Sequence, residues 1–324
     1  MYHFCTYFDR NYLLRGLTLY RSLAATGCDF TLNVLALDAE TENTLTLLDL
    51  PNLKTIPLAV LEAWEPGLEI AKGNRSLIEY YFTLSPLLPL YILKHEPQTE
   101  VITYLDADLY FYGSPEPIFT ELGDRSILVI EHRYPDYLKT NERFGLFNVQ
   151  YESFRHDTHG LACLERWRDQ CLEWCYDRDE PTRYADQKYL NEWPERYGDH
   201  LVVLQHRGAG VAPWNWATYP LEIQHNKMHV GGAPLIFYHF HGVKIFHPCF
   251  ISNGLADWGI MPRRPMRWLY AGYLRQLRTT RSWLSKDHGV DLPLKDRFIR
   301  GQGINMATMQ EIARKAWAQG MVVV

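Results

Sequence analysis

Strand-like and helix-like segments alternate along the first third of the chain, and this order limits the fold more than any other feature. The apolar runs YHFCTYF, FTLNVLALD, LKTIPL and EVITYLD read as strands. Segments with helical spacing separate them, among them NYLLRGLTLYRSLAATG, which ends at Gly27. Strands that alternate with helices form βαβ units, so we expect an α/β fold with a mostly parallel sheet flanked by helices.

The later part of the chain is more mixed. Further strands are expected in RSILVIEHR, FGLFNVQYESF, HLVVLQHRG and APLIFYHFHG, and helices in HGLACLERWRDQCLEWCYDR and YADQKYLNEWPERY. The segment SLIEYYFTLSPLLPLYILKH reads as a helix interrupted by Pro86 and Pro89, because proline lacks a backbone N–H. We expect one catalytic domain over residues 1–250 and a helical, basic-aromatic extension over residues 251–324.

The composition is that of an ordinary globular protein. Hydrophobic residues make up 47% of the chain and charged residues 22%, and the net charge of -5 does not point to nucleic acid as a partner. No basic segment followed by an apolar core opens the sequence, so no secretory signal is expected. The scattered cysteines, with Cys171 and Cys175 on an expected helix and Cys249 further on, are predicted to be reduced thiols of a cytoplasmic protein.

Two carboxylates one residue apart follow the fourth expected strand, in YLDADLYFY. Side chains at positions i and i+2 of an extended chain point to the same side, so Asp106 and Asp108 should converge. Two unpaired carboxylates held close together repel each other unless a cation lies between them. Asp9 follows the first strand and shares the edge of the sheet where such folds bind ligands. The sequence therefore favours a cation site here; the alternative is a strand end whose aspartates cap the next turn.

Five segments in order resemble the nucleotide-sugar transferases of the GT-A fold, and most closely the glycosyltransferase family 8-like group. They are TYFDRNYLLRGL at the first strand and helix, YLDADLYFY at the metal-binding stretch, GLFNVQ, YADQKYLN and HFHGVK. The resemblance covers residues 1–250 and implies a Rossmann-like GT-A sheet. It also implies transfer of a sugar, with retention of configuration, from a UDP-linked donor to a glycan or a lipid-linked acceptor.

The same resemblance implies a set of site residues. Mn²⁺ or Mg²⁺ would be held by Asp106, Asp108 and His239, with His241 as the alternate ligand. The nucleotide and its diphosphate would meet Thr6, Asp9, Asn11 and Lys244. The transferred sugar would lie beside Asn148, Asp186 and Gln187. Asp9 and Asn11 suit equally well the capping of the helix that follows them, and Asp186 the capping of QKYLNEW.

The chain departs from the family pattern in several places. Gln150 stands where the family has glycine beside the sugar, and Lys244 comes one residue early after His239. The family's arginine before the paired aspartates has Arg75 as its nearest counterpart, poorly aligned. The segment GAGVAPWNW reads as a loop with stacking surfaces and is our expectation for the acceptor wall. The sequence therefore resembles a divergent member of the group.

Two other function classes remain open. A sugar nucleotidyltransferase would need a glycine-rich, lysine-bearing phosphate loop after the first strand, which TYFDRNYLL does not offer. A non-catalytic nucleotide- or glycan-binding relative is the second rival, favoured by the departures at Gln150 and Lys244. Residues 263–286 combine seven Arg or Lys with Trp and Tyr and no acidic residue, which suits peripheral contact with anionic lipid at the inner face of a membrane. The alternative is a basic surface helix packed on the domain.

Overall fold

The structure is a computed structural model that describes residues 1–247, 250–255, 257–294, 298–299, 302–303, 310 and 322–323. The chain divides into two compact units that interleave along the sequence. Unit 1 comprises Met1–Phe8, Gly27–Asp106 and Ser114–His206, and unit 2 comprises Asp9–Thr26, Ala107–Gly113 and Arg207–Val324. Cys249 and most of the chain after residue 294 lie outside the described residues, and the expected domain boundary after residue 250 stays a prediction.

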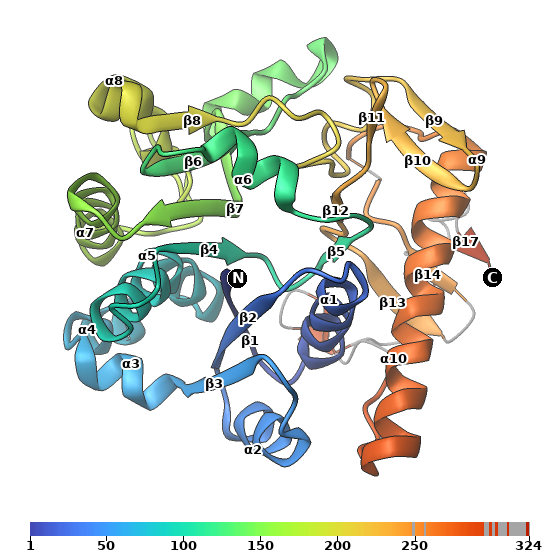
Figure 1. Ribbon diagram of the computed structural model, residues 1–324, viewed down its shortest axis with the longest axis horizontal. Helices are drawn as coiled ribbons and strands as arrows, with labels where there is room; N and C mark the ends of the chain where they lie inside the picture. The colour runs from blue at the N-terminus through green and yellow to red at the C-terminus, as the bar shows by residue number, and fades with distance from the viewer. Residues whose placement is uncertain are drawn as a thin grey trace. The chain divides into compact units, whose positions relative to one another are not determined.

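Unit 1 is built on a seven-stranded sheet with the strand order β3-β2-β1-β4-β7-β6-β8 (Figure 1). Its strands are β1 (Tyr2–Phe8), β2 (Phe30–Ala36), β3 (Leu53–Pro57), β4 (Val101–Leu105), β6 (Ile127–Glu131), β7 (Phe147–Arg155) and β8 (Leu201–Val203). All neighbouring strands pair in parallel except β7, which is antiparallel to both β4 and β6. The mostly parallel α/β sheet predicted from the alternating pattern is thus confirmed.

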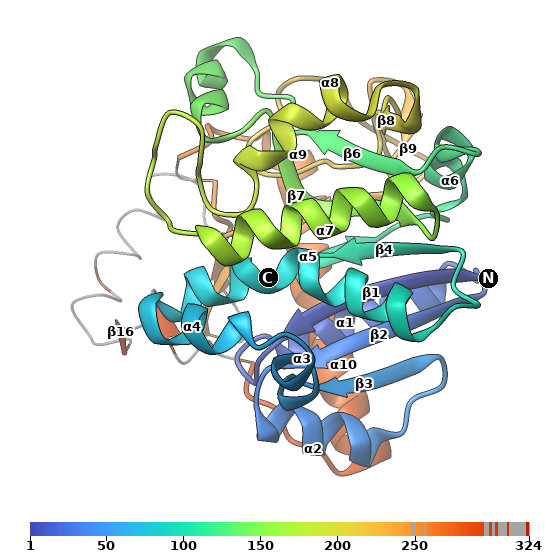
Figure 2. The ribbon, with the colours of Figure 1, turned by 90° about the vertical axis from the view of Figure 1, so that its left-hand side faces the viewer.

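Two long helices lie side by side across one face of this sheet (Figure 2). They are α5 (Leu77–His95) and α7 (Thr158–Glu173). Together with the strands they enclose a core of fully buried side chains that includes Leu84, Leu88, Ile102 and Trp167. The remaining helical segments of unit 1 are α2 (Ala39–Leu48), α3 (Leu58–Trp64), α4 (Gly67–Asn74), α6 (Glu116–Leu122), η1 (Asp136–Phe144), η2 (Lys188–Glu192), α8 (Trp193–Tyr197) and η3 (Gly198–His200).

The predicted interruption of α5 at its two prolines is wrong. Ser76 begins the helix with a capping box, in which its hydroxyl oxygen accepts from the backbone N–H of Glu79 and the Glu79 carboxylate accepts from the backbone of Ser76. The helix then runs through Pro86 and Pro89, both buried, to His95. Because proline has no backbone N–H, neither position leaves a donor without a partner. Burial of the apolar residues of the helix outweighs the backbone hydrogen bonds that are missing. The helix expected in YADQKYLNEWPERY instead divides into η2 and α8.

Unit 2 joins helix α1 (Leu13–Ala25) to short ribbons and to one long helical run (Figure 1). Its strands are β5 (Leu109–Phe111), β9 (Leu221–Gln224), β10 (Lys227–Val230), β11 (Ala233–Pro234), β12 (Phe237–His239), β13 (Lys244–His247), β14 (Phe250–Ser252), β15 (Phe298–Ile299), β16 (Gln302–Gly303) and β17 (Val322–Val323). The helical run consists of α9 (Arg263–Met266), the π-helical turn η4 (Arg267–Ala271) and α10 (Gly272–His288).

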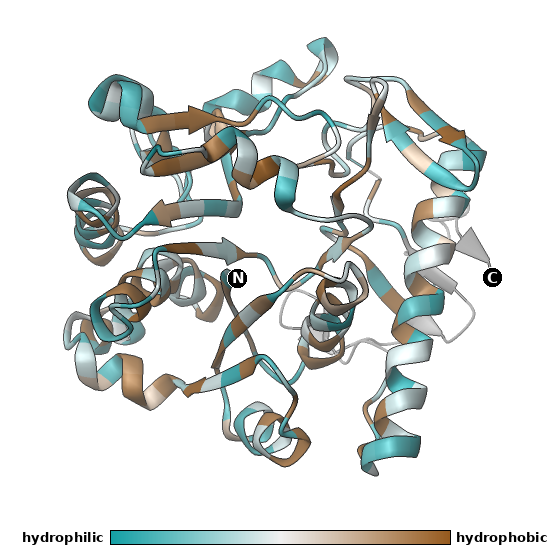
Figure 3. Cartoon of the chain, in the orientation of Figure 1, coloured by the Kyte–Doolittle hydropathy of each residue, from teal (hydrophilic) through white to brown (hydrophobic). Residues whose placement is uncertain are grey.

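Hydropathy along α10 alternates between hydrophobic and hydrophilic bands (Figure 3). Leu274, Leu277 and Leu284 are buried, whereas Arg275 and Lys286 are exposed. Such a pattern belongs to a helix that packs on its own unit with one face and presents the other to solvent. None of the helices in the described residues is both long and apolar enough to cross a bilayer.

Candidate metal and donor site

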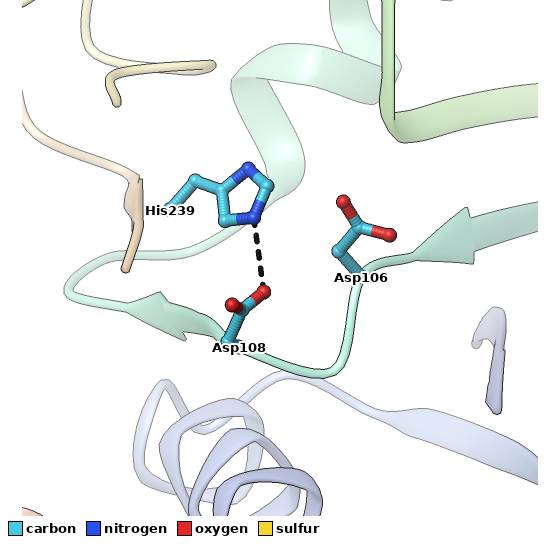
Figure 4. A group of neighbouring side chains, drawn as sticks. All are labelled: Asp106, Asp108 and His239. Atoms are coloured by element: carbon cyan, nitrogen blue, oxygen red, sulfur yellow. Dashed lines mark ion pairs between the residues drawn. The ribbon is translucent and has the colours of Figure 1, made fainter. Parts of the chain in front are cut away.

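A buried carboxylate–imidazole contact forms the centre of the candidate site in unit 2. Strand β5 begins one residue after Asp108 and pairs antiparallel with β12, whose last residue is His239. The His239 Nε2 atom lies 2.9 Å from the Asp108 Oδ1 atom (Figure 4). The backbone N–H of Phe240 also donates to the Asp108 carbonyl at 3.0 Å, so main-chain bonds hold both residues in place. Asp108 is 7% exposed and His239 4% exposed.

The surroundings of Asp108 keep its carboxylate ionised. Burial by itself would raise the pKa of Asp108, but the His239 imidazole outweighs this effect and the pKa falls below its ordinary value. His241 and Arg15 lower the pKa of Asp108 further. An ionised carboxylate is the form that binds a divalent cation.

Asp106 joins this pair in a group of side chains that suits a metal ion. It directly follows β4, and its Oδ1 atom accepts a hydrogen bond of 3.0 Å from the hydroxyl of Tyr104. Asp106, Asp108 and His239 each offer one ligand atom, and these three atoms lie within 4.8 Å of one another (Figure 4). Two neighbouring ligands of an octahedral ion with bonds of about 2.1 Å lie about 3 Å apart, which the 2.9 Å contact between Asp108 and His239 matches. The two aspartates therefore converge on one imidazole, but the extended conformation predicted for them is wrong, because Ala107 and Asp108 form a turn between β4 and β5.

Arg15 is a neighbour of this site that the sequence analysis missed. It lies in α1, is 4% exposed, and its guanidinium donates to the carbonyl oxygen of Val243 at 3.2 Å. The guanidinium also lies 4.8 Å from the ring centroid of Tyr12. The available signal was its place in the sequence LLRGL, where an arginine is surrounded by residues of the buried helix face.

Trp214 forms an apolar wall beside both histidines. Its ring centroid lies 5.2 Å from that of His239 and 5.5 Å from that of His241, in edge-to-face arrangements. Desolvation, and then repulsion from the His239 imidazole, lower the pKa of His241, so this ring is neutral at pH 7. The residue as a whole is accessible to solvent, although its ring packs against those of Trp214 and His239, and His241 is absent from the group of candidate ligands found among the described residues. The predicted role of GAGVAPWNW as an acceptor wall stays a prediction.

Three predicted nucleotide-binding residues also belong to unit 2. The Asp9 carboxylate accepts from the backbone N–H groups of Asn11 and Tyr12, at 2.9 and 3.2 Å, and from the Asn11 side chain at 2.8 Å. These bonds close a turn from Asp9 to Tyr12, but the N-cap of α1 is Tyr12 and no side chain caps the helix, so the alternative capping role considered for Asp9 and Asn11 is wrong. Lys244 opens β13, and its charge contributes to the lowered pKa of His241.

Unit 1 contains a buried polar network around the predicted sugar-binding residue Asp186. Burial raises the pKa of Asp186 to about 7, while a hydrogen bond to Ser85 opposes the shift. The Ser85 hydroxyl lies 3.1 Å from the hydroxyl of Tyr7. The ring of Tyr7 in turn lies 5.6 Å from that of Tyr104, the residue that donates to Asp106. Asp186 is therefore a carboxyl group able to hold or release a proton near neutral pH.

Asn148 and Gln187 are held by backbone carbonyl groups. The Asn148 amide donates to the Ile130 carbonyl at 3.1 Å, and its side-chain oxygen is buried without a hydrogen-bond partner among the described residues. Gln187 donates to the Phe144 carbonyl at 2.9 Å. Gly145, beside Gln187, has a φ of +140°, a backbone conformation that favours glycine, and a Cβ there would lie only 3.3 Å from the Phe147 carbonyl oxygen.

Thr6 and Gln150 are enclosed in the sheet. Both side chains are 0% exposed. The Thr6 hydroxyl finds no hydrogen-bond partner among the described residues. The role of Thr6 in nucleotide binding therefore stays a prediction, and it requires that the residues covering the Thr6 side chain move apart. Glu152, on β7 and also 0% exposed, is a buried carboxyl group that the sequence analysis did not single out, and desolvation raises its pKa well above the ordinary range.

Solved structures similar to this chain are sugar transferases. The galactosyltransferase LgtC, solved in complex with donor and acceptor sugar analogs, has a TM-score of 0.53 at 15% identity over 88% of this chain and 99% of its own. The glycosyltransferase GlyE of Streptococcus pneumoniae TIGR4 has a TM-score of 0.50 at 13% identity over 89% of this chain and 64% of its own. At these identities the likeness establishes the fold alone, which is the GT-A fold that the sequence predicted.

Two curated proteins of Bacillus subtilis (strain 168) are more similar in sequence. The uncharacterized protein YfnD is 28% identical over 92% of this chain and 94% of its own length. The uncharacterized protein YfnF is 31% identical over 75% of this chain and 82% of its own length. No profile of an established protein family matches the sequence. By its identity to YfnF over most of both chains, this chain belongs to the YfnF family.

Proposed function

We propose that this protein is a metal-dependent glycosyltransferase that uses a nucleotide-sugar donor, with UDP as the nucleotide. The observation that carries the proposal is the contact of 2.9 Å between Asp108 and His239, with Asp106 two residues away. The GT-A fold and the resemblance to the family 8-like group support it. LgtC, which shares the fold, is by its description a galactosyltransferase that was solved in complex with donor and acceptor sugar analogs.

A bound metal would supply Lewis-acid stabilisation of the leaving diphosphate. Asp106, Asp108 and His239 would hold that metal, and an imidazole beside two carboxylates favours Mn²⁺ over Mg²⁺. Lys244 would add a positive charge toward the diphosphate. Arg15, buried beside Asp108, would hold the carboxylate ionised in the absence of metal.

The transferred sugar would be bound by polar residues of unit 1. Asn148 has a buried oxygen that a sugar hydroxyl would satisfy. Gln187 and Asp186 would lie beside the anomeric centre, with Asp9 and Asn11 at the nucleoside and Thr6 at the nucleotide. The proposal also includes a glycan or a lipid-linked sugar as the acceptor. It places the protein in the cytoplasm, with peripheral membrane contact through residues 263–286.

The proposal is tested by calorimetric titration of UDP in the presence and absence of Mn²⁺. Asp108→Asn keeps the shape of the side chain but removes its charge, and we expect it to abolish the metal-dependent part of UDP binding. Asp199→Asn, at an exposed position in η3, is the matched control and should bind as the wild type does. Metal-dependent UDP affinity that is unchanged in Asp108→Asn would refute the metal assignment.

A second measurement separates the enzyme from a non-catalytic binder. Mn²⁺-dependent release of free sugar from UDP-glucose or UDP-galactose, followed by chromatography, is expected for a transferase with water as a slow acceptor. A binder would hold these donors intact. Formation of a nucleotide sugar from a sugar phosphate and UTP would instead favour a nucleotidyltransferase.

A further inference from the structure

Unit 2 contains an open pocket of about 830 Å³ whose walls are rich in arginine. Its helical wall is the continuous run formed by α9, η4 and α10. Arg263, Arg264, Arg267 and Arg275 line this wall. The end of β5 contributes Tyr110 and Tyr112, and the turn between β9 and β10 contributes Asn226. No residue of the donor or metal site described above lines the pocket.

The described residues do not neutralise the positive charge of this pocket. The residues that line it include no Asp or Glu. Within the described part of the chain, none of the four arginines forms an ion pair with a carboxylate, although other arginines such as Arg166 do. Like charges grouped in one pocket repel each other and are stabilised by a bound anion.

The shape of the helical wall adds a second, independent observation. Arg267 opens a π-helical turn, which is rare and occurs often at functional sites. Trp268 in the same turn lies 4.9 Å from the ring of Tyr112, measured between centroids. Tyr110 packs edge to face on Tyr273 of α10 at 6.1 Å. These ring contacts hold the end of β5 against the helix, so the arginines project from a wall that is packed in place.

The ligand chemistry follows from the type of cation. A guanidinium presents its N–H donors as a planar fork that matches two oxygens of a phosphate. A single carboxylate would satisfy one such fork, whereas a phosphate or diphosphate carries enough charge and enough oxygens for several. Trp268 and Tyr112 offer partly exposed ring faces of the kind that sugar rings stack on.

The pocket lies close to Asp108 along one strand. Tyr110 and Tyr112 follow Asp108 by two and four residues, and an extended chain covers at most about 14 Å in four residues. Resting on the function proposed above, we propose that this pocket binds a phosphate or diphosphate group of the acceptor. The acceptor is thereby assigned to phosphorylated glycans or lipid-linked sugars rather than to neutral glycans.

Binding of inorganic pyrophosphate, measured by calorimetry in the presence of EDTA, tests the pocket without metal and without a donor. The double variant Arg267→Gln/Arg275→Gln removes two forks from the pocket wall. We expect it to weaken pyrophosphate binding about 100-fold, since each lost charge-assisted hydrogen bond corresponds to about a factor of ten and the variant loses at least two. The control Arg281→Gln/Lys286→Gln removes the same charge from exposed positions of α10 outside the pocket and should change binding little.

A second arm distinguishes the source of the phosphate. Co-sedimentation compares vesicles of phosphatidylcholine alone with vesicles that also contain phosphatidylglycerol. If the pocket variant loses affinity for pyrophosphate, the pocket binds a soluble phosphate. If the pocket variant loses binding only to the anionic vesicles, the pocket binds the phosphate of a lipid headgroup. Equal losses in the pocket and control variants, or no loss with either probe, would overturn the proposal. The Asp108→Asn variant should bind pyrophosphate in EDTA like the wild type, so failure here is distinguishable from failure of the metal-dependent function.

Discussion

The buried carboxyl group of Asp186 should make the stability of this protein depend on pH in a specific direction. Burial raises its pKa from 3.8 to about 7. A carboxyl group whose pKa is higher in the folded state binds its proton more tightly there. Stability that is present at low pH is therefore lost as the pH rises from about 4 to about 7. Each pKa unit corresponds to about 1.4 kcal/mol, so a shift of about three units costs the wild type about 4 kcal/mol above pH 7.

The variant Asp186→Asn removes this titration and keeps the shape of the side chain. Its buried amide introduces a constant difference in the free energy of unfolding, because one new donor needs a partner. The informative quantity is the change of that difference with pH. Relative to the wild type, the variant should gain up to about 4 kcal/mol in unfolding free energy between pH 4 and pH 8.

Urea denaturation of both proteins at pH 4.5, 6 and 8, followed by tryptophan fluorescence, measures the difference directly. Asp199→Asn, an exposed aspartate in the same unit, is the control and should show the pH dependence of the wild type. A free-energy difference between Asp186→Asn and the wild type that stays the same from pH 4.5 to pH 8 would show that Asp186 is ionised in the folded protein. Asp186 would then not be a carboxyl group that holds or releases a proton near neutral pH.

Two further predictions concern the metal site and its neighbour. His239→Ala should weaken Mn²⁺ binding in the presence of UDP by about 10- to 100-fold, whereas His241→Ala should have a smaller effect. A calorimetric Mn²⁺ titration compares the two variants, and a larger loss of affinity in His241→Ala would assign His241 as the ligand instead. Arg15→Met should lower the free energy of unfolding, measured by urea denaturation, by about 1 to 3 kcal/mol, because it leaves the buried Val243 carbonyl without its donor. An unchanged free energy of unfolding would contradict the burial of that contact.

The sequence by itself determined the architecture of the sheet and the position of the paired aspartates. Alternation of apolar strands with helices requires parallel pairing, and this held for every strand of unit 1 except β7. The sequence also located Asp106 and Asp108 at the end of β4, although the structure brings them together through a turn between β4 and β5 and not through an extended chain. Glycine after α1 ended that helix as predicted, with Gly27 at a φ of +75°. These are local properties, which depend on neighbours along the chain.

Only the tertiary structure decided which distant residues complete the site. The family resemblance named His239 before His241, but the contact of His239 with Asp108 depends on the register of β12 on β5, which no local pattern specifies. The continuity of α5 through its prolines depends on burial against the sheet, and the role of Arg15 on the fold of α1 beside Val243. The arginines around the pocket were visible in the sequence as a basic stretch, but only packing of Trp268 on the end of β5 gathered them into one cavity. Register, burial and packing are set by the whole fold, because each depends on contacts between residues far apart in the chain.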